Sequence, residues 1–145
     1  MNKQEFKQLV GEVLKENGFT YSNKYYQLEN NELKVFIDFQ KSNFSNSFYI
    51  NYCFLVKALH EGETKISLKN SDFRSRFAYY TSEKTLGDFD LENLDDDAAR
   101  LSIQKGIDED ILPAFKESAI KYLNERPIMK MMTSLEAKKY FKFIE

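Results

Sequence analysis

Two stretches in which every second residue is large and apolar constrain the fold more than any other feature. Residues 33–39 and 48–56 show this alternation, and a repeat of two residues is that of a β-strand. In the second stretch the intervening positions include Cys53 and Leu55, so both faces of this strand are largely apolar. Because an apolar face must be covered, we predict that residues 48–56 form a central strand with other elements packed on each side.

The first stretch is preceded by a turn and a partner strand. Tyr26 and Leu28 alternate in the same way before residues 30–31, which are both asparagine, a residue that favours turns. We therefore predict a β-hairpin in which Leu28 lies opposite Leu33 across a two-residue turn. This register places two glutamates opposite one another, and like charges in that position repel modestly. A wider, four-residue loop with the same faces and register is the alternative.

The chain begins with a helical pattern. Asn2 and Glu5 have the spacing of a capping box, and apolar residues follow at intervals of three and four up to Leu14. Gly18 is the residue type best suited to the left-handed conformation just beyond a helix. We predict a first helix that ends at Gly18, with Phe19 placed to contact Leu14.

A longer helical pattern begins at residues 95–97, three aspartates that suit the N-terminus of a helix. Pro113 removes one backbone donor and crowds the preceding turn, so we predict a kink there, or two shorter helices that meet near Leu112. The pattern ends at residues 126–127, because proline disfavours a helical residue before it. A last helix is predicted from the capping-box spacing of residues 133–136, which begin with threonine and end with glutamate.

Between the hairpin and these helices the pattern is weaker. After a charged loop over residues 57–72, Phe77 and Tyr79 indicate a fourth strand, and Phe89 indicates a short fifth one. The chain has 145 residues, about the length of one domain. We predict a single α+β domain over residues 1–145, with an N-terminal helix, an antiparallel sheet of four to five strands in a meander, and C-terminal helices packed on the sheet.

Composition argues against several classes of protein. The formal net charge is −2, whereas nucleic-acid binders generally carry a basic excess, which makes a nucleic-acid partner unexpected. No apolar run approaches the roughly 20 residues that span a bilayer, and the first residues lack the apolar core of a signal peptide. Cys53 is the single cysteine and cannot form an intramolecular disulfide. We expect a cytoplasmic protein without membrane association; the oligomeric state stays open.

Residues that carry catalysis or bind metals are sparse. One cysteine and one histidine cannot build a zinc site, and the sequence contains neither an EF-hand loop nor a glycine-rich phosphate loop. Cys53 needs a nearby base to act as a nucleophile, and the one histidine, His60, follows in the charged loop. A buried structural cysteine is the simpler interpretation. We expect no catalytic residues, no cofactor and no metal, and we incline to a protein that is not an enzyme.

Strand parity brings one set of polar residues together. Asp38 and Gln40 point away from the apolar face of their strand and neighbour Asn51 on the next strand. Arg74 and Arg76 reach the same face if they lie on the adjacent strand. These five residues are the candidate ligand-binding site, a polar pocket with aromatic walls. The simpler alternative is an ordinary ion pair between Asp38 and one arginine on a partly solvated sheet.

The order of segments also resembles a known family. The helix end "VLKENGF", the hairpin "YYQLEN", the strand pair "VFIDFQKSNFSNSFYINYCFLVK" and then "DFRSRF" follow one another. In this order they resemble the bacterial domain-of-unknown-function family 4304, most specifically over residues 39–42 and 48–51. The resemblance extends over residues 9–122 and implies a single bacterial α+β domain. Because the family is uncharacterised, it implies neither an activity nor catalytic residues.

These observations favour a binding protein. We expect a non-catalytic module, such as an immunity or accessory protein, that engages another protein through an aromatic-rich surface. The alternative is a small-molecule-binding protein, or an unrecognised enzyme, that uses the polar pocket on the sheet face. A third hypothesis is the stacking of single-stranded nucleic acid on exposed tyrosines, with Arg74 and Arg76 at the phosphates.

Overall fold

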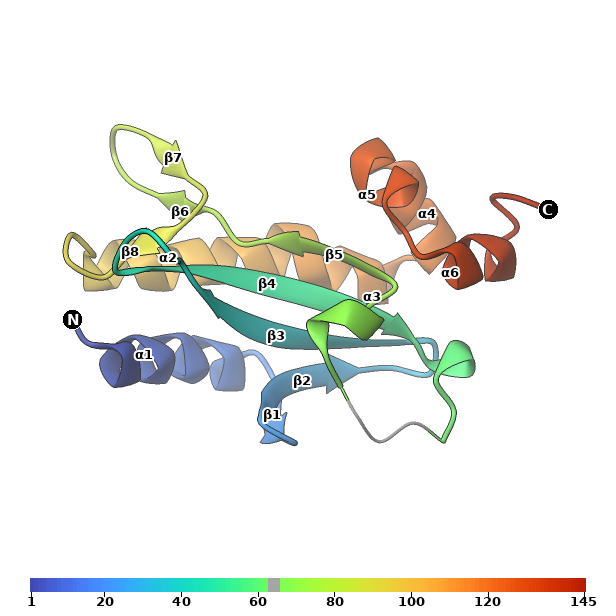
Figure 1. Cartoon of the computed structure of the whole chain (residues 1–145), viewed down its shortest axis with the longest axis horizontal. Coiled ribbons are helices and arrows are strands. Elements are labelled where there is room, and N and C mark those ends of the chain that lie inside the picture. Colours follow the sequence, from blue (N-terminus) through green and yellow to red (C-terminus); the bar gives the residue numbers. More distant parts are fainter. Residues whose placement is uncertain (63–65) are drawn as a thin grey trace.

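The computed structural model describes residues 1–62 and 66–145 and shows an α+β fold, as predicted (Figure 1). Residues 63–65 of the predicted charged loop lie outside the described residues. The α-helices are α1 (Lys3–Glu16), α2 (Asp96–Gly106), α3 (Leu112–Lys116), α4 (Ala119–Asn124), α5 (Pro127–Met131) and α6 (Leu135–Tyr140). The short 3-10 and π segments are η1 (Lys57–Leu59), η2 (Leu68–Asn70) and η3 (Ile107–Ile111). The strands are β1 (Thr20–Ser22), β2 (Tyr25–Glu29), β3 (Leu33–Lys41), β4 (Ser47–Val56), β5 (Phe73–Arg76), β6 (Tyr79–Tyr80), β7 (Thr85–Leu86) and β8 (Phe89–Asp90).

The main sheet is an antiparallel meander in the order β1, β2, β3, β4, β5. β8 pairs with Ser47 and Phe48 at the start of β4, on the side of β4 where β5 pairs further along. β6 and β7 form a separate small ladder. β4 is therefore the central strand that the two apolar faces of residues 48–56 predicted.

The register of the first hairpin differs from the prediction by two residues. Leu28 lies opposite Val35, and Glu29 lies opposite Lys34. The wider turn is stabilised by the side-chain oxygen of Asn30, which accepts hydrogen bonds from the N–H groups of Glu32 and Leu33. The shift replaces two opposed glutamates with an ion pair, 3.5 Å from Lys34 Nζ to Glu29 Oε2. Because the shift is an even number of residues, the predicted faces are kept.

Both predicted caps of α1 are present. The side chain of Asn2 accepts from the Glu5 N–H, and the Glu5 side chain accepts from the Asn2 N–H. At the other end Gly18 has φ +89°, a conformation that L side chains rarely adopt. The N–H of Phe19 then donates to the Leu14 carbonyl, which is the long hydrogen bond of a Schellman motif.

The predicted long helix is divided where expected but ends earlier than expected. α2 passes through the π segment η3 into α3, which starts at Leu112 beside Pro113, so the predicted junction is correct. The helical run does not extend to Arg126, because Glu117 is extended and Ser118 caps a new helix, α4. The last helix, α6, is capped by Ser134 and not by Thr133 as predicted. The Ser134 side-chain oxygen accepts a hydrogen bond from the Ala137 N–H.

The fourth strand, β5, lies earlier in the sequence than the predicted strand around Phe77 and Tyr79. β5 covers Phe73–Arg76, whereas Phe77 and Tyr79 follow it as buried residues. Phe73 stacks on Phe54 of β4 with ring centroids 4.8 Å apart, which fixes this earlier register. β8 confirms the predicted short strand at Phe89. Tyr79, which was expected in the fourth strand, lies in the short strand β6, and β1 and β7 had no sequence signal strong enough to predict them.

The two faces of the sheet are covered unequally. The main core lies between one face, here the inner face, and the helices, with α2 and α3 running behind β4 and β5 in Figure 1. On the opposite, outer face a small cluster of Phe36, Cys53 and Leu55 is covered by Ile66 and Leu68 of the loop after β4. The rest of the outer face carries polar side chains, and it is there that the predicted site lies.

Candidate functional site

The antiparallel ladder places the five predicted residues on the outer face. Asp38 of β3 lies opposite Asn51 of β4, and Gln40 follows two positions along the same strand. On the other side of β4, Asn51 pairs with Arg76 of β5, and Arg74 pairs with Cys53. The alternation of side chains across a strand then turns all five toward one side.

Asn51 is the centre of this cluster. Its Nδ2 donates to Asp38 Oδ2 at 3.1 Å and to Gln40 Oε1 at 3.2 Å, and its Oδ1 accepts from Arg76 Nε at 3.3 Å. The Asn51 residue is 4% exposed, so a buried amide has its polar groups satisfied by its neighbours. The cluster is thus a connected network that holds Arg76 in place.

The guanidinium of Arg76 stacks on an aromatic ring that the polar pattern did not include. Its Cζ lies 4.0 Å from the centroid of Tyr49, the β4 residue opposite Gln40. Such a cation–π contact contributes about 0.5 to 1 kcal/mol at exposed sites. Tyr49 follows the same parity as Asn51, so the alternation of β4 places it on this face among the expected aromatic walls, although it is not one of the five candidate residues.

Arg74 lies on the same face, but its side chain contacts the loop after β4 instead of the cluster around Asn51. Its Nη1 donates to the Leu68 carbonyl at 2.8 Å and to Ser71 Oγ at 3.3 Å. Arg74 therefore ties η2 to the sheet. Over the described residues neither Arg74 nor Arg76 forms an ion pair, so the simple pairing of Asp38 with an arginine is not what holds this face.

A shallow groove of about 420 Å³ runs between η2 and this cluster. It is lined by Gln40, Asn51, Leu68, Arg74, Ser75 and Arg76. The three β5 residues are exposed, and the Asn51 amide on the floor already has its hydrogen-bond partners. The groove thus offers an open arginine-bearing surface and lacks the enclosure that buries most of a small ligand.

Cys53 lies beneath the loop on this face and is unsuited to nucleophilic chemistry. The residue is fully buried. Burial raises the pKa of the thiol to about 12, and the negative charge of Asp38 adds to the shift. The reactive thiolate is therefore scarce at neutral pH, and His60 pairs with an aspartate instead.

That aspartate is Asp72, to which the sequence analysis assigned no structural or functional role. It is buried, and its Oδ2 lies 2.8 Å from His60 Nε2 and accepts from the Val56 N–H at 2.8 Å. Its Oδ1 accepts from Ser134 Oγ at 2.8 Å. Asp72 joins the end of β4, the loop and the start of α6. Since the hydroxyl contacts the carboxylate and not the imidazole, the three side chains do not form a nucleophile activated by a base.

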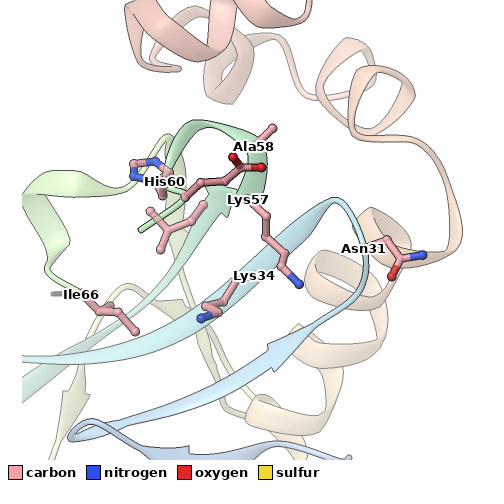
Figure 2. Close-up of a pocket in the computed structure, with 8 residues that line it drawn as sticks. Asn31, Lys34, Lys57, Ala58, His60 and Ile66 are labelled. Atoms are coloured by element: carbon pink, nitrogen blue, oxygen red, sulfur yellow. The ribbon is translucent and has the colours of Figure 1, made fainter. Parts of the chain in front are cut away.

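A second pocket lies at the other end of the outer face, beyond Ile66 (Figure 2). It has a volume of about 360 Å³, a floor formed by Leu55, and Lys34 and Lys57 at its edge. Glu29 Oε2 lies 3.5 Å from one ammonium nitrogen and 3.7 Å from the other. Because one carboxylate partly neutralises both lysines, the attraction of this pocket for an anion is weakened.

The described residues offer neither a metal site nor a membrane-spanning helix. Residues 1–62 and 66–145 contain no group of three histidine, cysteine, aspartate or glutamate side chains placed to hold a metal ion. Among the helices of this described part, none is long and apolar enough to cross a bilayer.

Comparison with protein families gives a match over most of the chain. The model of a family described as a domain of unknown function, DUF4304, matches residues 10–117, which is more than half of the chain. No curated protein and no solved structure matches. The matched segment includes the whole outer-face cluster but ends before α4.

Proposed function

The chain belongs to the DUF4304 family of unknown function, and from this premise we propose that it is a non-catalytic binding module that engages another protein through the outer face of its sheet. The observation that carries the proposal is the exposed Arg76 guanidinium stacked on Tyr49 and held by Asn51. Arginine and tyrosine are enriched among the residues that dominate protein interfaces. A side chain already fixed in one conformation loses less entropy on binding.

The charge of this face indicates the chemistry of the partner. Arg74 and Arg76 are exposed, and in the described part of the chain no carboxylate forms an ion pair with either. Carboxylates of a partner can form the bidentate contacts that guanidinium groups favour. Phe44, in the loop between β3 and β4, is 98% exposed and offers a further apolar side chain to a partner. We propose an acidic protein surface as the partner.

We also propose a cytoplasmic location and an accessory or immunity-like role in a bacterial cell. The support for the location is a free, buried thiol at Cys53, which suits a reducing compartment. The support for the role is the exposed pair Arg74 and Arg76 on the polar outer face, where no described nucleophile contacts a base.

The test is a binding titration with a partner captured from the source cells by the intact chain. We expect Arg76→Ala and Tyr49→Ala each to raise the Kd by about tenfold, which corresponds to roughly 1.4 kcal/mol. Lys84→Ala, an exposed change on the β6–β7 hairpin, is the matched control and should leave the Kd unchanged. An unchanged Kd in both face variants would refute the proposed face.

Small-molecule binding is the second candidate function, favoured by the groove of about 420 Å³ beside Arg74 and Arg76. A small anion bound there would raise the Tm by mass action. Thermal unfolding in the presence of small dicarboxylates tests this candidate. A Tm increase that is absent in Arg76→Ala would favour the small-molecule function over the protein partner.

A further inference from the structure

Helix α5 is apolar except at Lys130, but among its residues only Met129 is buried. Residues 127–132 read Pro-Ile-Met-Lys-Met-Met, with a single polar residue. Met129 packs in the main core, whereas Ile128, Met131 and Met132 are 76%, 65% and 73% exposed. Positions three and four apart lie on one helix face, and a helix that is apolar all round is normally buried. The outer half of α5 therefore lacks a cover.

Three more exposed apolar residues follow α5 in the sequence. Leu135, Tyr140 and Ile144 are also exposed. The C-terminal apolar patch is defined here as Ile128, Met131, Met132, Leu135, Tyr140 and Ile144. Other exposed large hydrophobic residues, such as Leu101 on α2, are scattered singly along the chain. Extended apolar patches of this kind mark interaction sites, and methionine adapts its shape to different partners.

A groove within the patch offers a place for one apolar side chain. It has a volume of about 350 Å³ and is lined by Pro127, Met131, Phe143 and Ile144, with Lys130 and Lys138 at its sides. Ligand pockets measure roughly 300 to 1,000 Å³, so this groove lies at the small end of that range. It suits an anchoring side chain of a partner more than a whole small molecule.

The charged side chains in the segment that carries the patch are mostly basic, and the exceptions within residues 127–145 are Glu136 and Glu145. Lys130, Lys138, Lys139 and Lys142 surround it, and over the described residues none of the four forms an ion pair. The Lys130 ammonium lies 4.4 Å from the Phe143 ring centroid and donates to Asn124 Oδ1. A partner with acidic groups is complementary to this charge.

We propose that the C-terminal apolar patch is a docking surface for a segment of another protein that carries a large apolar residue flanked by Asp or Glu. The apolar residue enters the groove beside Met131, and the carboxylates contact the surrounding lysines. The patch lies outside residues 10–117, so this surface is distinct from the family-matched outer face and independent of the function proposed for it.

The experiment is a selection from a displayed library of random peptides, with the intact chain as bait. We expect enriched peptides in which Leu, Ile, Met or Phe is flanked by Asp or Glu. Met131→Asp should reduce retention of these peptides at least tenfold, whereas Leu101→Asp, an equally exposed residue outside the patch, should not. The double variant Lys138→Glu/Lys139→Glu should select basic residues in place of acidic ones.

Several results would overturn the docking surface. One is the absence of enrichment, and another is enrichment that is equal in Met131→Asp and in the unchanged chain. Reversible dimerisation in sedimentation velocity that Met131→Asp abolishes would show that a second copy covers the patch. Sedimentation with anionic phospholipid vesicles, lost in the lysine double variant, would show a membrane surface instead. Circular dichroism of each variant checks its fold, and the lysine double variant provides an independent test if Met131→Asp unfolds.

Discussion

At the scale of single residues, the burial of Cys53 determines its reactivity. The thiol is fully buried and its pKa is raised to about 12, first by burial and then by the charge of Asp38. The neutral thiol reacts poorly with alkylating and disulfide reagents. We therefore expect the native protein to react with Ellman's reagent at pH 8 at least a hundredfold more slowly than the protein in denaturant. Equal rates in the two conditions would contradict the buried, protonated thiol.

The positions of the outer-face residues could be predicted because they depend on parity alone. Asp38, Gln40 and Asn51 follow from the period of two within each strand, and no knowledge of the turns is needed. The contact that fixes Arg74 to the Leu68 carbonyl could not be predicted, since it depends on how the loop folds over the sheet. The role of the outer-face residues in binding stays a prediction.

At the scale of elements, Asp72 joins segments that are distant in the sequence. Asp72→Ala would leave the Val56 N–H without its acceptor and remove the bonds to His60 and Ser134. A buried donor without a partner costs about 1 to 3 kcal/mol, and bonds to a charged group contribute further. We expect the free energy of unfolding to fall by about 2 to 4 kcal/mol in urea titration.

Two variants make this measurement specific. Glu83→Ala removes an exposed carboxylate and should change the free energy of unfolding by less than about 0.5 kcal/mol. Asp72→Asn keeps one carbonyl oxygen as an acceptor and should cost less than Asp72→Ala. If Asp72→Ala behaved like Glu83→Ala, the aspartate would not hold these elements together.

Elements with local signals were predictable, and those determined by distant contacts were not. The capping box and the Schellman motif of α1 depend on residues within one turn of the helix ends. The hairpin register was missed although its contacts are local, because the sequence alone does not show that the Asn30 side chain accepts from the turn or that Glu29 pairs with Lys34. β5 starts at Phe73 because that ring stacks on Phe54, a residue of another strand. Such contacts exist only once the sheet has formed.

At the scale of the whole molecule, the apolar character of β4 on both faces predicted a covered central strand. It could not predict that helices cover one face while a loop covers part of the other. Both arrangements bury the same alternating residues, so the hydrophobic pattern does not distinguish them. The difference matters for function, since the loop leaves the cluster around Asn51 open.

Helices cover one face of the sheet and a loop covers part of the other, so we expect the same substitution to lower the free energy of unfolding by different amounts on the two faces. Phe54 and Phe36 are both 0% exposed. Phe54 stacks on Phe73 and lies 5.6 Å from the Tyr122 ring in the main core, so Phe54→Ala should reduce the free energy of unfolding by about 3 to 5 kcal/mol. Phe36 lies in the small cluster below Ile66 and Leu68. A loop can move toward the sheet and fill part of the cavity left by the substitution. We therefore expect Phe36→Ala to reduce the free energy of unfolding by less than Phe54→Ala does.

Hydrogen exchange separates the two effects. In Phe36→Ala we expect faster exchange of the amides of Asn70 and Ser71, which donate within the covering loop, while the amides of α2 keep their protection. In Phe54→Ala the protection of the whole sheet should fall together, because that ring belongs to the core shared by the sheet and the helices. If the two variants showed equal costs and the same exchange pattern, the loop would be as integral to the fold as the helices, and the outer face would be a second core.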